Sequence, residues 1–169
     1  MSELKTQRGF VLLESLLAIL IFSLGILGMV ATYARAVQAA GDAEYRTEAA
    51  RLADEIASRI TLAVNRGADR TNPVAVSAAI AASLPAFAHQ ATGSATAAAC
   101  AFTGAVSGNT IVTAWVGKVG AALPASSAAR QQIVVDATAA GFNRVAITLC
   151  WRAPSDQAFR QHTLVTYIN

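Results

Sequence analysis

The longest uninterrupted pattern in this chain is an apolar run near its start. Phe10 to Ala31 are 22 positions with a single charged side chain, Glu14. A helix needs about 20 apolar residues to cross the roughly 30 Å hydrocarbon core of a bilayer. The run therefore predicts a transmembrane helix over residues 10–31, with one carboxylate inside it.

The helix is expected to continue beyond the membrane. No proline precedes Pro73 and the first strong stop is at residues 65–67, so one helix is predicted from Phe10 to about Asn65. Its outer part, residues 32–66, is amphipathic, with charge pairs on one side and apolar side chains at three- and four-residue spacing on the other. The charge pairs are Asp42/Arg46 and Glu55/Arg59. The apolar stripe, expected to pack on the C-terminal domain, is Ala49, Leu52, Ala53, Ile56, Ile60 and Ala63.

Residues 67–110 carry little periodic pattern. Ala, Thr, Ser and Gly dominate, and Pro73 and Pro85 interrupt any long element. A short helix is predicted from Val74 to Leu84. Residues 88–109 are predicted to form a loop with one strand near Cys100-Ala101-Phe102.

The pattern becomes regular again after residue 110. A short helix is predicted from Thr110 to Leu123, ended by Pro124. Its expected buried face is Ile111, Trp115, Val119 and Leu123. Alternating apolar residues then predict three strands, with Val145, Ile147, Leu149 and Trp151 on one face of the second. The strands are Gln132–Ala137, Arg144–Arg152 and His162–Ile168. The fold class is thus α+β: a long N-terminal helix packed on a small antiparallel sheet.

Composition and charge agree with this division. Hydrophobic residues make up 54% of the chain and charged residues 14%, against about half and a quarter in soluble domains. The apolar run explains much of the excess. The net charge of +3 is weak and scattered, so no nucleic-acid surface is expected.

The basic residues before the run predict its orientation. Lys5 and Arg8 precede Phe10, so the positive-inside bias places the N-terminus in the cytoplasm and the C-terminal domain outside. In a Gram-negative-type cell that outer compartment is the oxidising periplasm. Cys100 and Cys150 can form a disulfide there; two buried free thiols are the alternative.

Glu14 argues against an ordinary signal peptide. Ala34-Arg35-Ala36 offers a signal-peptidase site, which would give a mature start at Val37. A disposable signal has no need of a carboxylate that costs roughly 2.5–3.5 kcal/mol at a bilayer centre. Cleavage between Gly9 and Phe10 would instead create an α-amine at Phe10, oppositely charged to Glu14 at neutral pH. That amine, from the same or a neighbouring subunit, is the expected partner of Glu14.

The string from Arg8 to Glu14, RGFVLLE, resembles the class III leader of type IV pilins and type II secretion pseudopilins. The resemblance implies cleavage after Gly9 by a prepilin peptidase, N-methylation of Phe10 and a role for Glu14 in aligning subunits. Val11 stands where this family commonly has Thr. The chain would then comprise a leader (1–9), the transmembrane helix (10–31), its periplasmic continuation (32–66) and a globular pilin domain (67–169).

The C-terminal half resembles the minor pilins of this family. The features that carry the resemblance are Ala114-Trp115, Leu123-Pro124, Cys150-Trp151 and the segment from His162 to Thr166. It implies a subunit of the inner membrane and then of the pilus, which primes assembly beside other minor pilins, the major pilin and a tip adhesin. A minor pseudopilin of type II secretion shares the leader and the helix and is the first alternative.

Catalytic and metal-binding motifs are missing from the sequence. It has no GxSxG, HExxH, CxxC or phosphate-binding glycine loop. His89 and His162 have no acid or Cys at metal-ligand spacing, so no cofactor, metal or enzymatic activity is expected. The basic grouping near the sheet, Arg144, Arg152 and Arg160, is interpreted as solvent-facing strand ends, and contact with a partner or with DNA is the alternative. A signal-anchored periplasmic enzyme or binding module is the remaining alternative.

Overall fold

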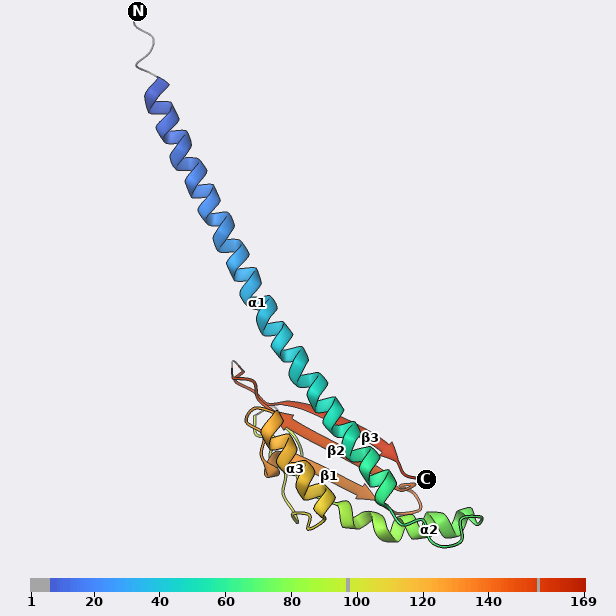
Figure 1. The fold of residues 1–169 in the computed structure, drawn as a ribbon. Helices are drawn as coiled ribbons and strands as arrows, with labels where there is room; N and C mark the ends of the chain where they lie inside the picture. The colour runs from blue at the N-terminus through green and yellow to red at the C-terminus, as the bar shows by residue number, and fades with distance from the viewer. Residues whose placement is uncertain (1–6, 97, 155) are drawn as a thin grey trace, which may run out of the picture. The chain divides into compact units, whose positions relative to one another are not determined.

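The computed structural model describes residues 7–96, 98–154 and 156–169, with side chains from Phe10 onward. The chain divides into two compact units, Met1–Ala43 and Glu44–Asn169. The described part of the first unit is entirely helical. The second unit contains all the strands and shorter helices (Figure 1).

Helix α1 (Gln7–Ala63) is one continuous helix. The sequence predicted residues 10–65; the structure starts the helix three residues earlier and ends it two residues earlier. Its five predicted core positions from Ala49 to Ile60 are buried, as expected. Ala63 is exposed, contrary to the prediction, and the next residue, Val64, is buried instead. Val64 lies four residues after Ile60, and its N–H donates to the Ile60 carbonyl oxygen at 3.0 Å, so the four-residue spacing continues to the end of the helix.

The middle of the chain forms one α-helix and one short 3-10 helix. Helix α2 (Pro73–Ser83) matches the predicted helix closely, and the side chain of Asn72 caps its first turn by accepting bonds from two backbone N–H groups. The 3-10 helix η1 (Leu84–Phe87) follows. The strand expected near Cys100-Ala101-Phe102 is not formed: Cys100 has a positive φ of 34°, and only an isolated bridge joins Thr92 and Thr103.

Helix α3 (Thr110–Ala122) covers the predicted short helix. Trp115, Val119 and Leu123 are buried as expected, but Val112 replaces Ile111 as the fully buried residue of the first turn. The indole Nε1 of Trp115 donates a 2.8 Å hydrogen bond to the carbonyl oxygen of Leu52. This bond attaches α3 to the C-terminal part of α1.

The three predicted strands are present and form one antiparallel sheet in the order β1-β2-β3. They are β1 (Gln131–Asp136), preceded by the 3-10 helix η2 (Ala128–Arg130), β2 (Arg144–Trp151) and β3 (Arg160–Tyr167). The alternating residues of β2 are all buried, on the face that packs on α3 and on residues 49–64. The α+β fold class predicted from the sequence is therefore confirmed.

Candidate functional site

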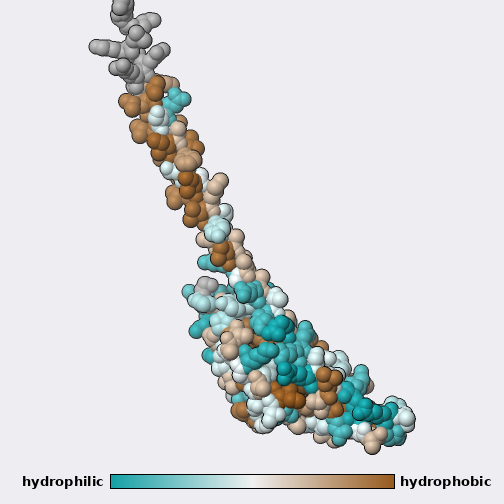
Figure 2. All heavy atoms as spheres, viewed as in Figure 1, coloured by the Kyte–Doolittle hydropathy of each residue, from teal (hydrophilic) through white to brown (hydrophobic). Residues whose placement is uncertain are grey.

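The N-terminal part of α1 is an apolar surface without a protein partner in the single chain. Its most apolar 18-residue window has a mean hydropathy of 2.6 and is entirely unburied. Phe10 is 73% exposed and Leu12 67%, and Figure 2 shows hydrophobic atoms covering this stretch. The helix is long and apolar enough to cross a membrane, either as an anchor or as a signal segment.

Three hydroxyl groups in this stretch are satisfied by the helix itself. Ser15 donates to the carbonyl oxygen of Val11 at 2.8 Å, and Ser23 donates to that of Ile19 at 2.7 Å. Thr32 likewise donates to a carbonyl of the preceding turn. Such bonds lower the cost of placing a hydroxyl in hydrocarbon. These polar side chains therefore need no partner from outside the helix.

Glu14 differs from these hydroxyl residues. It is exposed on α1, and among the side chains that the structure describes none forms a hydrogen bond or ion pair with it. Phe10 lies one helical turn before it, on the same side of the helix. α1 continues through the Gly9–Phe10 bond, where the cleavage is predicted. The side chains of Lys5 and Arg8, on which the predicted orientation depends, lie outside the described ones.

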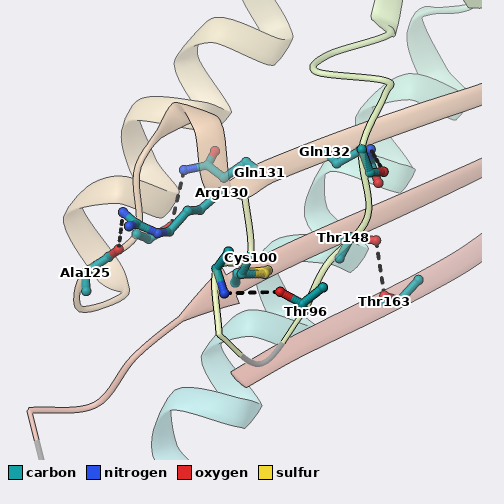
Figure 3. The surroundings of a disulfide bond; sticks show 12 residues. Thr96, Cys100, Ala125, Arg130, Gln131, Gln132, Thr148 and Thr163 are labelled. Atoms are coloured by element: carbon teal, nitrogen blue, oxygen red, sulfur yellow. Dashed lines mark hydrogen bonds between the residues drawn. A yellow bond between two sulfur atoms is a disulfide. The ribbon is translucent and has the colours of Figure 1, made fainter. Parts of the chain in front are cut away.

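The two cysteines lie in the second unit. Cys100, in the loop before α3, and Cys150, on β2, form a disulfide with 6.2 Å between their Cα atoms. Both are buried with Phe102, and the partly buried Ala95 and Phe159 pack against them. Figure 3 shows the surroundings of the disulfide at Cys100. The pairing is the one expected from the sequence. A disulfide indicates an oxidising compartment.

The predicted basic grouping is not one cluster. Arg144 begins β2 and Arg152 follows its end, so the length of the strand separates them. Arg152 and Arg130 both contact the ring of Phe159, with guanidinium carbons 5.0 and 4.4 Å from its centre. Sequence reasoning missed Arg130, because its approach to Phe159 depends on β1 and β3 both pairing with β2.

Arg160 forms an ion pair with Asp156, four residues earlier. Its guanidinium lowers the pKa of the Asp156 carboxyl below the ordinary value. Because Arg160 is neutralised locally and Arg152 lies against a ring, this end of the sheet does not present a row of free cations among the described residues.

His89 is a structural residue that the sequence did not reveal. It is 1% exposed; its Nε2 lies 3.1 Å from the carbonyl oxygen of Ala128, and its Nδ1 accepts a 3.2 Å bond from the N–H of Ser107. This pattern assigns the neutral tautomer with the proton on Nε2. No group of three or more metal-ligating side chains occurs among residues 7–96, 98–154 and 156–169.

A charge network joins α1 to α3. Glu55 pairs with Arg59, as predicted, and also with Arg51 and with Lys118 of α3. The ammonium of Lys118, which donates a hydrogen bond to Glu55, lowers the pKa of this carboxyl, and partial desolvation opposes the shift. The network fixes α3 on this helix from the solvent side.

The structure thus defines a class of architecture: a long apolar N-terminal helix joined to a small antiparallel sheet, the pilin-like α+β arrangement. Comparison with protein-family models, with curated proteins and with solved structures gives no match.

Proposed function

We propose that this chain is a minor type IV pilin, most similar to the PilV type, which primes or modifies pilus assembly from a minor-pilin complex at the filament tip. The observation that carries the proposal is Glu14. It is a carboxylate without a described partner on a helix whose neighbouring hydroxyls are satisfied. An isolated charge in hydrocarbon is costly and needs a partner.

Cleavage after Gly9 by a prepilin peptidase would supply that partner. It would leave an α-amine at Phe10, which such enzymes also N-methylate in the pilin family. In the inner membrane, Glu14 of the incoming subunit pairs with the Phe10 amine of a neighbour. The pairing lowers the cost of both charges and sets the axial position of one helix against the next. The subunit then leaves the membrane as the filament grows.

The rest of the molecule is compatible with this proposal. The N-terminus would lie in the cytoplasm, and the disulfide-bonded unit in the periplasm and later on the pilus. Partners would be other minor pilins, the major pilin and a tip adhesin, and the assembled pili would serve adhesion and twitching motility.

N-terminal analysis of the exported protein tests the cut. A mature start at N-methylated Phe10 is expected, whereas a start at Met1 or Val37 would contradict the proposal. Glu14→Ala should leave membrane insertion intact but reduce co-purification with partner pilins and the number of surface pili. Ser15→Ala is the matched control, because the Ser15 hydroxyl bonds only its own helix; it should behave like the parent protein. Unchanged pili and co-purification in Glu14→Ala would count against the role of Glu14.

A minor pseudopilin of type II secretion is the second candidate, since the same leader and the same unpartnered Glu14 support it equally. Deletion of the gene separates the two. Loss of pili and twitching with normal enzyme secretion supports the pilin, and the opposite result supports the pseudopilin.

A further inference from the structure

The two outer edges of the sheet differ in whether their backbone N–H and C=O groups are hydrogen-bonded. The outer edge of β1 is covered: His89 and Ile133 exchange backbone hydrogen bonds of 3.1 and 2.9 Å. The side-chain amide of Gln132 also donates to the carbonyl oxygens of Gln90 and Thr92. The segment before α3 therefore shields β1 from pairing with another strand.

The outer edge of β3 is open. The N–H of Ile168 donates to the carbonyl oxygen of Asn143, and bonding alternates along an antiparallel pair. The even-numbered residues of β3 therefore bond β2, and the odd-numbered ones turn their N–H and C=O groups outward. These are Gln161, Thr163, Val165 and Tyr167. All four are exposed, and no described residue pairs with their outward backbone groups.

β3 also lacks the devices that usually block edge pairing. Its eight residues contain no Pro and no Lys, and its register with β2 is continuous, without a bulge. Its only side chain with a permanent charge, Arg160, is at the start of the strand and pairs with Asp156. Val165 is 46% exposed and Tyr167 55%. An open edge of this kind accepts an added strand readily.

An open groove of about 460 Å³ runs beside this edge, between β3 and α1. Its floor and walls are mostly small or apolar, and Leu62 on its rim is 83% exposed. Asp54 is the single charged residue that lines it. The neighbouring acids Glu48 and Glu55 have cationic partners, but no described cation pairs with Asp54.

We propose that the β3 edge and this groove bind an extended segment of another protein, which adds to the sheet as a fourth strand antiparallel to β3. Side chains on one side of an added strand would enter the groove, so the segment carries apolar residues at every second position. A Lys or Arg at the end next to Asp54 neutralises that carboxylate. The inference uses only residues of the Glu44–Asn169 unit and does not depend on the proposed function.

A second copy of this chain fits the edge less well. In a β3–β3 pair, the second copy would offer the same strand, whose one permanently charged side chain, Arg160, pairs with Asp156. A second copy would therefore not supply a cation to Asp54. A flexible segment of another protein has no such constraint.

A synthetic peptide with Val, Leu, Val and Lys at positions 2, 4, 6 and 8 and Thr between them is the probe. It is titrated into the ¹⁵N-labelled full chain in detergent micelles. The amides of Gln161, Thr163, Val165 and Tyr167 should shift and exchange with solvent at least tenfold more slowly, while the amides that face β2 stay unchanged. No shift at these four residues, or shifts elsewhere only, would overturn the proposal.

Variants locate the contact. Val165→Pro removes an outward N–H without removing a bond to β2 and should weaken peptide binding at least tenfold; Val165→Thr keeps the N–H and should bind normally. If Val165→Pro fails to fold, Thr163→Pro makes the same test at the next outward position. Asp54→Asn should weaken binding of the Lys peptide severalfold but not of its Gln analogue. Equal binding by the Pro and Thr variants, or protection of these amides in a dimer of the protein alone, would refute the proposed occupant.

Discussion

Replacing Cys100 and Cys150 together with alanine removes a crosslink that spans 50 residues of the chain. In the chain-entropy model, a loop of about 50 residues corresponds to about 4 kcal/mol of stabilisation at 25 °C. The bridged segment contains α3, β1 and nearly all of β2. The uncrosslinked unfolded chain therefore gains freedom over this bridged segment, and the second unit should be destabilised by about this amount.

The size of the expected effect is large for a small domain, since total stabilities are about 5–15 kcal/mol. The Glu44–Asn169 unit has 126 residues. With an unfolding entropy of about 2.1 cal/mol/K per residue, a loss of about 4 kcal/mol lowers its melting temperature by about 15 °C. Alanine is preferred to serine because both sulfurs are buried and a buried hydroxyl without a partner adds its own cost.

Tryptophan fluorescence follows this unfolding selectively. Both tryptophans of the chain, Trp115 and Trp151, are buried in the core of the second unit, so the full-length protein in detergent micelles can be used. Thiol counting under denaturing, non-reducing conditions should find no free thiol in the oxidised parent. Two free thiols in exported protein, or a double-alanine variant that melts within about 4 °C of the parent, would refute the reasoning.

Two further changes test the contacts inside this unit. The pKa of Glu55 is lowered, first by its bond from Lys118, so its stabilising effect is present above the ordinary pKa of 4.5 and is lost as the pH falls below that value. Glu55→Gln should therefore cost about 1 kcal/mol at pH 7 and almost nothing at pH 3, as measured by urea unfolding; an equal cost at both pH values would contradict the ion-pair interpretation. His89→Ala leaves the Ala128 carbonyl and the Ser107 N–H without their buried partner, which should cost about 2–4 kcal/mol. The control is His162→Ala, on the half-buried face of β3, and a similar cost for both variants would show that the His89 bonds contribute little.

The regular elements of this fold could be predicted because each has a strong local signal. Twenty-two residues with one charge define the start of α1, and Pro73 with Asn72 before it marks the start of α2. The alternation in β2 identified the residues that face the helices. Thr148 and Cys150 on the opposite face are buried as well, and the alternation did not predict that. Two errors lie in terminal turns, at Ala63 and Ile111, where three- and four-residue spacings fit the sequence equally well. A third is the strand expected near Cys100-Ala101-Phe102, which is not formed.

Contacts between distant segments could not be predicted in the same way. His89 has no periodic neighbours, and its burial depends on Ser107 and Ala128, which are 18 and 39 residues away. The ring of Phe159 meets Arg130 only because the sheet brings the two chain segments together. Glu14 could be singled out from the sequence, since a lone carboxylate in an apolar run needs no tertiary information to be noticed.

Two exposed surfaces of the described chain, the apolar part of α1 and the outer edge of β3, lack a partner, and they need different ones. The apolar surface around Glu14 needs hydrocarbon or other apolar helices together with one positive charge, and a neighbouring subunit with a free amine would supply both. The outward groups of β3 need backbone donors and acceptors at strand spacing, which a helix cannot offer because its own backbone groups are already bonded. One partner helix therefore cannot satisfy both, so a chain that assembles through α1 still has the β3 edge available for a second protein. Disrupting Glu14 and blocking the edge at Val165 should accordingly impair different associations.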